Sequence, residues 1–338
     1  MILDQLRMRG SKQASELHSG REHAIAAALS DCGCERELNE DRWGIIESVA
    51  GTGYFVFDGM GGESGGEAAA QLSLDAVAGF LRDTELRDTA QAIEGAIQRA
   101  QNVISLRRQN PAVASMGTTV VGALWQGPEV VIAAVGDSRA YRIHSGGIDQ
   151  LTSDHTFVQK LVDEGHIVPQ DALLHPQSHI LTRCVGSSIG FGIDIKRFWL
   201  SPAKTEEQVE CLVLCSDGLY SLVTDDEIRS VVMSLPAEEA CENLVRLAKE
   251  RGGYDNITVM IIPLAGSLKT TPDESVLRSR NIASLTMGQP SCQKSQLSLQ
   301  NSNGQFVSSF YRRIGIFLGV TTMVITGILF LIIKFVGS

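Results

Sequence analysis

The sequence predicts an α+β fold that is built on antiparallel sheets. Short segments that are β-branched or alternate in polarity recur through the first 265 residues, and Gly, Asp and Asn turns separate them. These strand candidates cluster in hairpin-like pairs. The helix candidates do not alternate with them regularly, which disfavours a doubly wound parallel sheet.

Each expected element has a local reason in the sequence. The strand candidates are short, β-branched or alternating, and bounded by turns. They are residues 24–29, 43–47, 53–57, 118–125, 130–135, 140–143, 198–200, 209–214 and 256–262. The first helix candidate has apolar residues at positions 68, 72, 76 and 80, which lie on one helical face. The helix candidates are residues 66–82, 89–107, 155–164, 224–233 and 237–251.

Composition divides the chain into four zones. Residues 1–20 are a polar lead-in, and residues 21–265 form the predicted folded domain. Residues 266–311 are rich in Ser, Gln and Asn. Such a composition cannot bury enough apolar surface to offset the entropy of ordering, so we expect a disordered linker. Residues 314–333 form the fourth zone and carry no charge.

The uncharged segment 314–333 is predicted to be a transmembrane helix. At about 1.5 Å per residue it spans roughly 30 Å, the hydrocarbon thickness of a bilayer. A buried core helix is the alternative, but no later chain could cover it. Arg312 and Arg313 precede the segment, Lys334 follows it, and no signal peptide opens the chain. We therefore expect a single-pass protein of the cell membrane whose N-terminal domain faces the cytoplasm.

The formal net charge of −10 argues against nucleic-acid binding, because an acidic body repels phosphate backbones. Several of the carboxylates stand where an apolar strand candidate ends or begins. They are Asp41, Asp58, Asp137, Asp217 and Asp255. Carboxylates collected at one sheet edge repel each other unless they are protonated or bind hard cations such as Mg²⁺ or Mn²⁺. Gly59 would let its carbonyl turn toward such a cation.

Simpler interpretations stay open for single residues. An Asp-Gly after a strand is more often a plain turn than a ligand, so only the joint pattern favours a metal site. Arg36 could grip a phosphate with its guanidinium fork, or pair on the surface with Glu35 or Glu37. The histidines are dispersed along the chain, which disfavours a zinc enzyme.

Short motifs follow one another in a specific order across residues 21–265. They include Asn39-Glu40-Asp41, Phe57-Asp58-Gly59-Met60-Gly61-Gly62, Met116-Gly117-Thr118-Thr119, Val135-Gly136-Asp137-Ser138-Arg139, Leu181-Thr182-Arg183, Cys215-Ser216-Asp217-Gly218 and Tyr254-Asp255-Asn256. In this order they resemble the protein phosphatase 2C family, the metal-dependent serine/threonine phosphatases, and most of all its bacterial branch. The resemblance implies a four-layer α-β-β-α sandwich whose two central sheets are antiparallel, with the metals at one end.

The resemblance also implies a ligand set for two Mn²⁺ or Mg²⁺ ions. Asp58 would bridge both ions, and Asp217 and Asp255 would complete the first. The carbonyl of Gly59 would serve the second ion, with Asp41 in its water shell. Both ions would lie in the predicted catalytic domain.

Three further features follow from the same resemblance. Asp137 matches an acid that many bacterial members use for a third ion, and Arg36 matches the phosphate-binding arginine. Residues 154–185 match the family's flap, a variable lid beside the site. Met60 departs from the pattern, because some members carry a histidine there that is assigned as the general acid. Met cannot donate a proton, so water or the third metal site would have to assist.

The expected function is that of a metal-dependent serine/threonine protein phosphatase tethered to the membrane by its C-terminus. Phosphoserine and phosphothreonine would be hydrolysed by direct attack of a metal-bridging hydroxide. The expected partners are phosphorylated proteins, including a membrane-associated Ser/Thr kinase and its substrates. A catalytically silent phosphoprotein-binding module of the same fold is the alternative. A phosphatase dedicated to one regulator and an unrelated metal phosphodiesterase also stay open.

Overall fold

The computed structural model describes residues 26–61, 65–188, 191–200 and 210–265. The predicted lead-in, linker and transmembrane segment lie outside these described residues. Within the described ranges, no helix combines the length and the apolar character that a bilayer span requires.

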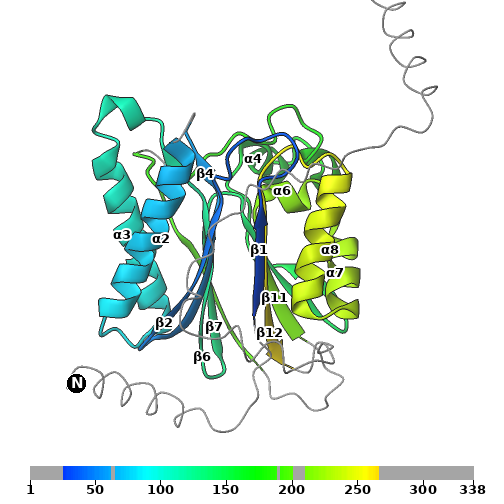
Figure 1. Ribbon diagram of the computed structural model, residues 1–338, viewed down its shortest axis with the longest axis horizontal. Helices are drawn as coiled ribbons and strands as arrows, with labels where there is room; N and C mark the ends of the chain where they lie inside the picture. The colour runs from blue at the N-terminus through cyan, green and yellow to red at the C-terminus, as the bar shows by residue number, and fades with distance from the viewer. Residues whose placement is uncertain (1–25, 62–64, 189–190, 201–209, 266–338) are drawn as a thin grey trace, which may run out of the picture. The chain divides into compact units, whose positions relative to one another are not determined.

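Two five-stranded sheets, in which all paired strands are antiparallel, lie face to face (Figure 1). The first sheet contains, in spatial order, β1 (Ala27–Asp31), β12 (Ile257–Ala265), β11 (Glu210–Cys215), β8 (Arg139–His144) and β9 (Gly147–Gln150). The second contains β10 (Asp194–Trp199), β7 (Glu129–Val135), β6 (Val120–Gln126), β3 (Gly51–Phe57) and β2 (Arg42–Ser48). A separate short ribbon pairs β4 (Gly59–Met60) with β5 (Gly117–Thr118).

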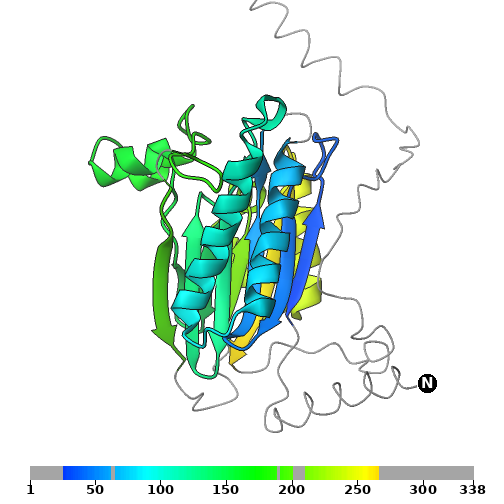
Figure 2. The same cartoon turned by 90° about the vertical axis from the view of Figure 1, so that its left-hand side faces the viewer.

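Helices cover the outer face of each sheet. α2 (Gly65–Asp83) and α3 (Thr89–Arg107) pack on the second sheet, and α7 (Asp225–Ser234) and α8 (Ala237–Glu250) lie on the side of the first (Figures 1 and 2). The shorter helices are η1 (Pro111–Val113), α4 (Phe157–Asp163), α5 (Pro169–Ala172) and α6 (Asp217–Tyr220). The predicted α+β class with antiparallel sheets is confirmed, and the layers follow the order α-β-β-α.

Three apolar layers hold the sandwich together, because alternate residues of a strand point to opposite faces. In β11, Leu212 and Leu214 enter the layer between the two sheets, whereas Cys211 and Val213 pack toward α8. A fully buried side chain of this size contributes about 1.5–3 kcal/mol. The third layer lies between α2, α3 and the second sheet.

Several element boundaries differ from the sequence prediction. The strand predicted at residues 198–200 is β10 (Asp194–Trp199), an edge strand whose mostly exposed side chains give no alternating pattern. The strand predicted at 118–125 is divided into β5 and β6. The prediction missed β4, β9, α5 and α6, all of which have at most four residues. Such short elements depend on tertiary contacts more than on local pattern.

The first and last described strands are neighbours. β1 pairs with β12, so that Ala27 faces Ile261 and Asp31 faces Ile257. β12 also pairs with β11 on its other side. The end of β12 that begins at Ile257 lies directly after Asp255, and this end of the sandwich holds the site described next.

Candidate metal and phosphate site

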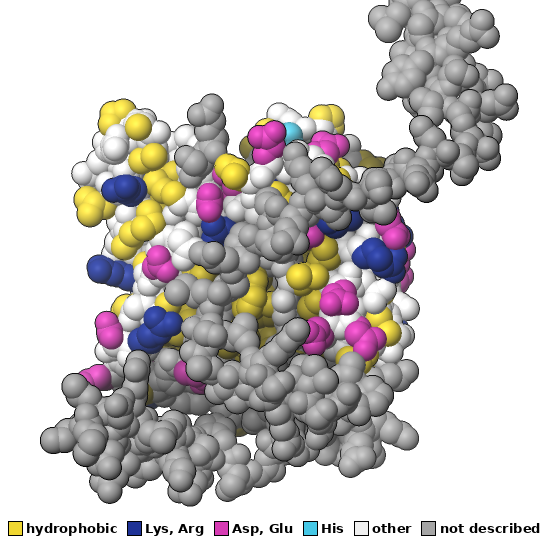
Figure 3. Space-filling model, viewed as in Figure 1, with side chains coloured by type: hydrophobic (Ala, Val, Ile, Leu, Met, Phe, Trp, Pro, Cys, Tyr) yellow, Lys and Arg dark blue, Asp and Glu magenta, His cyan; other side chains and the backbone are white. Residues whose placement is uncertain are grey.

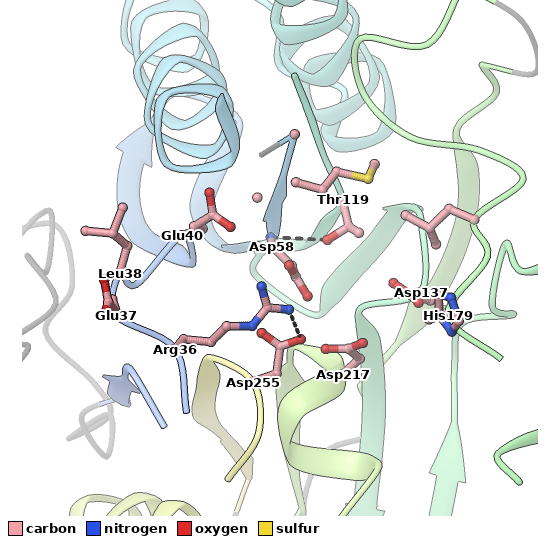
Figure 4. Close-up of a pocket in the computed structure, with 14 residues that line it drawn as sticks. Arg36, Glu37, Leu38, Glu40, Asp58, Thr119, Asp137, His179, Asp217 and Asp255 are labelled. Atoms are coloured by element: carbon pink, nitrogen blue, oxygen red, sulfur yellow. Dashed lines mark hydrogen bonds and ion pairs between the residues drawn. The ribbon is translucent and has the colours of Figure 1, made fainter. Parts of the chain in front are cut away.

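A pocket of about 520 Å³ opens at the end of the sandwich where β3, β7 and β11 finish and β12 begins (Figure 4). Six of the seven predicted site residues line it. They are Arg36, Asp58, Gly59, Asp137, Asp217 and Asp255. The seventh, Asp41, is fully buried and is not among the residues that line the pocket.

Asp58 directly follows β3, and hydrogen bonds with Thr118 and Thr119 hold its backbone. Its N–H donates to Oγ1 of Thr119 (3.2 Å), and its carbonyl accepts from the Thr119 N–H and the Thr118 hydroxyl (both 2.8 Å). A Cβ at Gly59 would lie 2.2 Å from the carbonyl oxygen of Gly66 and 2.7 Å from that of Glu40. Only glycine fits this close approach of three backbone segments.

Arg36 and Asp255 meet across the mouth of the pocket. The Arg36 guanidinium donates to Oδ2 of Asp255 at 2.9 Å, and half of the Arg36 side chain is exposed. Buried Asn256 fastens the loop that carries Arg36: its Oδ1 accepts from the Glu40 N–H (2.8 Å) and its Nδ2 donates to the Leu38 carbonyl (2.9 Å). Asn256 directly precedes β12, so the start of this strand fixes a loop from the other end of the described domain.

Asp41 and Asp217 each keep one carboxylate oxygen without a partner. Oδ2 of Asp41 accepts from the Ser216 hydroxyl at 2.8 Å. Oδ1 of Asp41 and Oδ1 of Asp217 are buried, and neither has a hydrogen-bond partner among the described residues. An unsatisfied buried acceptor is costly, so two of them beside one pocket indicate a group that they are arranged to bind.

The carboxylates disfavour one another's charge. Removal from water and then the nearby Asp41 and Asp217 charges raise the pKa of Asp58 well above its usual range. Removal from water raises the pKa of Asp41 to about 7, and removal from water with the Asp255 charge raises that of Asp217 to about 6. The pKa of Asp137 is also raised, by removal from water and the Asp217 charge. Divalent cations would relieve this repulsion.

A buried ion pair supports Asp137 from behind. Arg139 forms a two-pronged pair with Asp154, with contacts of 2.6 and 3.0 Å. The same guanidinium lies 3.7 Å from the centre of the Tyr220 ring. The Tyr220 hydroxyl in turn donates to the carbonyl of Asp137 at 3.0 Å. This chain of contacts links the start of the flap to the backbone of a predicted metal ligand.

The flap, residues 154–185, is tied to the sandwich at its two ends. Buried His155 accepts the Gly136 N–H on Nδ1 (3.0 Å), and its Nε2 lies 3.0 Å from Oδ2 of Asp194. At the other end Val185 forms a β-bridge to Thr118, and within the flap Thr156 and Leu181 form a second β-bridge. Between these ties the flap contributes two residues to the pocket, His179 and Leu181.

The donor set suits a hard divalent ion. It consists of carboxylate oxygens with the Gly59 carbonyl nearby, and these are the ligands that Mg²⁺ and Mn²⁺ prefer. No three His, Cys, Asp or Glu side chains of the described residues form a cage around one position. Mg²⁺ needs no such cage, because it retains several waters and takes one or two carboxylates plus substrate oxygens.

Sequence reasoning identified the carboxylates and missed the residues that lie around them. Thr119 holds the backbone of Asp58, and His179 and Leu181 reach the pocket from the flap. Thr119 had a usable signal, because it stands within the Met116-Gly117-Thr118-Thr119 motif. His179 had none, because no spacing relates it to the other site residues.

Charged side chains of both signs lie on the surface of the described domain, and the absence of a nucleic-acid partner stays a prediction. On the face shown in Figure 3, acidic and basic side chains are interspersed over the described part of the chain, without a continuous basic patch. Some of the described basic groups have acidic partners, as in the pairs Arg251–Glu227 and Arg246–Glu250.

Comparison with known families gives one match that covers most of the described domain. Residues 34–251 match the family model described as protein phosphatase 2C. Among curated proteins, the serine/threonine protein phosphatase PstP of Mycobacterium tuberculosis is 34% identical over 240 residues. This match covers 70% of the chain and 44% of PstP, so the chain spans less than half the length of that relative.

Other relatives match over nearly their full length. The serine/threonine phosphatase stp of Listeria monocytogenes is 32% identical, over 69% of this chain and 93% of its own. The crystal structure of the PstP catalytic domain in complex with two manganese ions is also similar. It has a TM-score of 0.62 and 31% identity, and the match covers 71% of this chain and 98% of that one.

Proposed function

The chain belongs to the protein phosphatase 2C family, and from this premise we propose that it is a metal-dependent phosphatase of phosphoserine and phosphothreonine in proteins. One observation carries the proposal: Asp58, Asp137, Asp217 and Asp255 line a single pocket together with one half-exposed arginine. Carboxylates suit the metals, and the arginine suits the phosphate. Cys215 is fully buried and is not among the residues that line the pocket, so it does not offer a nucleophile there.

The chain's own residues would bind and orient the reactants. Asp58, Asp217, Asp255 and the Gly59 carbonyl would hold two Mn²⁺ or Mg²⁺ ions, and Asp137 would hold a third. Asp41, with its unpartnered Oδ1, would hold a water of this cluster. When bound, the ions lower the pKa of water toward 7 and offset the charge that builds on the phosphoryl oxygens.

Arg36 would position the phosphate. In the structure its guanidinium donates to Asp255, and half of its side chain faces solvent at the pocket mouth. A guanidinium fork matches two phosphate oxygens, so an entering phosphate monoester can take up the donors of Arg36 that Asp255 does not use. The ester would then lie with phosphorus toward the carboxylates and its protein part toward solvent and the flap.

Phosphate release from a phosphothreonine peptide tests the proposal. The full chain in detergent should release phosphate with Mn²⁺ or Mg²⁺ and should stop when EDTA is added. A folded protein that binds the peptide at millimolar Mn²⁺ without releasing phosphate would support the silent binding module instead. Hydrolysis of bis-phosphate esters but not of phosphopeptides would indicate a phosphodiesterase.

We propose further that residues 314–333 anchor the protein in the cell membrane, with the catalytic domain in the cytoplasm. The support is the sequence: twenty uncharged residues with Arg312 and Arg313 on one side and Lys334 on the other. The anchor would place the enzyme near phosphoproteins at the membrane, including a membrane-associated Ser/Thr kinase and its substrates. A variant without residues 311–338 should lose sedimentation with membranes, and continued sedimentation would contradict the anchor.

A further inference from the structure

We propose that His179 of the flap is a catalytic residue that donates the proton to the leaving oxygen of the phosphorylated side chain. The inference rests on the proposed phosphatase function and assigns the proton donor that Met60 cannot supply. A serine or threonine alkoxide is a poor leaving group, so a positioned donor accelerates its departure by about 100- to 10,000-fold.

His179 shares the pocket with the carboxylates and lies on its flap side. His179 lines the same pocket as Asp58, Asp217 and Asp137. In Figure 4 it lies on the Asp137 side, whereas Arg36, Glu37 and Leu38 lie toward the opposite side. A phosphate held by Arg36 and the carboxylates would therefore have the flap, and His179 on it, next to its protein part.

The backbone that carries His179 is tied down. Directly after it, the Ile180 carbonyl accepts the Phe157 N–H at 2.8 Å, and Leu181 forms the β-bridge to Thr156. The Thr182 N–H then donates to the carbonyl of His155 at 2.7 Å. Three successive residues thus fasten the chain at the base of the flap, so that His179 is presented from an anchored segment rather than from the flap's tip.

His179 also differs from the other histidines that the structure describes. The rings of His144, His155, His166 and His175 each have a hydrogen-bond or ion-pair partner. Within the described ranges, the His179 ring has none, and the residue is exposed toward the pocket. A ring without a partner that lines a binding pocket is available to a ligand, whereas the other four serve the fold.

The other proton-bearing groups of the pocket are unsuitable. Arg36 does not give up its proton in proteins. The Thr119 hydroxyl is engaged with the Ser138 hydroxyl (2.7 Å) and the Asp58 N–H (3.2 Å). Met60 also lines the pocket, but its thioether has no proton. Glu37 and Glu40 also line the pocket, but Figure 4 shows them on the Arg36 side, away from Asp137. On the Asp137 side, apart from the carboxylates that would hold the metals, the His179 imidazole is the group that can carry and donate a proton.

Hydrolysis of the phosphate ester exchanges one bond at phosphorus for another. A hydroxide oxygen forms a bond to phosphorus while the bond from phosphorus to the side-chain oxygen breaks. The electron pair of that bond passes to the side-chain oxygen, which takes the proton from the His179 imidazolium and leaves as the serine or threonine hydroxyl. The neutral imidazole then regains a proton from solvent, and inorganic phosphate departs.

Leaving-group dependence tests the assignment. The full chain and its His179→Gln and His179→Ala variants would be assayed with Mn²⁺ on a phosphothreonine peptide and on p-nitrophenyl phosphate, whose phenolate leaves without a proton. Both variants should lose about 100-fold in kcat on the peptide and far less on the aryl ester. The matched control is His166→Gln, also on the flap and exposed, which should behave like the parent on both esters.

Each result decides between the two proposals. Equal losses on the two esters, or no loss on either, would overturn the role of His179 while the phosphatase function stood. Failure of the parent protein to hydrolyse both esters would overturn the phosphatase function and this role with it. Circular dichroism of each variant would show that an activity loss is not a loss of fold.

Discussion

The two sides of the pocket are built in different ways. We call Asp58, Asp137, Asp217 and Asp255 the carboxylate wall, because they stand at the ends of central strands. Hydrogen bonds from Thr118 and Tyr220 hold the backbone of Asp58 and Asp137. The flap, in contrast, carries exposed apolar residues such as Leu174 (83%) and Val168 (55%). Its ties to the sandwich gather at its two ends.

The difference teaches which part of the site can vary. Carboxylates that share a cation need a rigid backbone around them. A small displacement of one carboxylate changes both its repulsion with its neighbours and the geometry in which it binds the ion. The flap needs only an anchored base, and its remaining residues can change without displacing the carboxylate wall. Four predictions test this contrast, in order of decreasing effect.

Removal of a single carboxylate from the wall should have the largest effect. Asp58→Asn or Asp217→Asn should lower kcat on a phosphothreonine peptide by more than about 1,000-fold, since metal binding supplies several kcal/mol of transition-state stabilisation. The fold should survive, because the change removes a source of repulsion. Phosphate release would measure the loss of kcat, and thermal unfolding would measure whether the fold survives. Asp171→Asn on the flap is the control, and an equal loss there would erase the contrast.

Removal of Arg36, the proposed phosphate-binding residue, should have a smaller effect. Arg36→Ala should lower kcat/KM by about 10- to 100-fold, the value of a charged hydrogen bond to the substrate. Arg36→Lys should recover part of this loss, because it keeps the charge without the fork. Arg246→Ala removes an arginine from an exposed ion pair on α8 and should change nothing. A similar kcat/KM in the parent and Arg36→Ala would remove Arg36 from substrate binding.

Substitution of His155 should lower the stability of the domain, because the base of the flap is part of the rigid structure that carries the carboxylate wall. His155→Ala leaves the Gly136 N–H without its acceptor and should lower the free energy of unfolding by about 1–3 kcal/mol. His155→Asn can place an oxygen near the position of Nδ1 and should lose less. Urea unfolding of the two variants measures the difference. If both lose the same stability, the hydrogen bond to Gly136 is not what the histidine contributes.

Cys215→Ser should have the smallest effect on catalysis. Cys215 is fully buried in β11, and burial raises the pKa of its thiol above the usual range, so it is not a thiolate nucleophile. The variant should keep most of its phosphate release, although a hydroxyl in the core can lower the melting temperature. A large loss of activity in a folded variant would contradict the metal-based mechanism.

The carboxylate wall could be predicted because its signal is local. Asp58, Asp137 and Asp217 follow apolar strands directly, and strand ends meet by necessity at a sheet edge. The same logic gave the correct class of fold and the approximate positions of α2, α3, α7 and α8. The pattern of apolar and turn residues is enough to predict the position of a side chain when a single strand or helix determines that position.

The remaining features depend on contacts between distant segments. The Arg36 interaction with Asp255 joins residues that are 219 positions apart, and sequence proximity had favoured Glu35 or Glu37 as alternatives. His179 reaches the pocket because the segment after it bridges to Thr156, and an exposed loop residue carries no periodic signal for such a bridge. β10 was misplaced for the related reason that an exposed edge strand lacks alternation.

The pairing of β1 with β12 has a consequence for biosynthesis. Ser30 and Thr258 share a hydrogen bond across 228 positions, and β12 is inserted between β1 and β11. A ribosome-bound chain that has not yet released β12 has no Asp255, no Asn256 to fasten the Arg36 loop, and no partner for β1. Contacts of such long range form late. A nascent domain without β12 therefore lacks part of the proposed phosphatase site, and the proposed activity would begin only when β12, the last strand that the structure describes, has emerged.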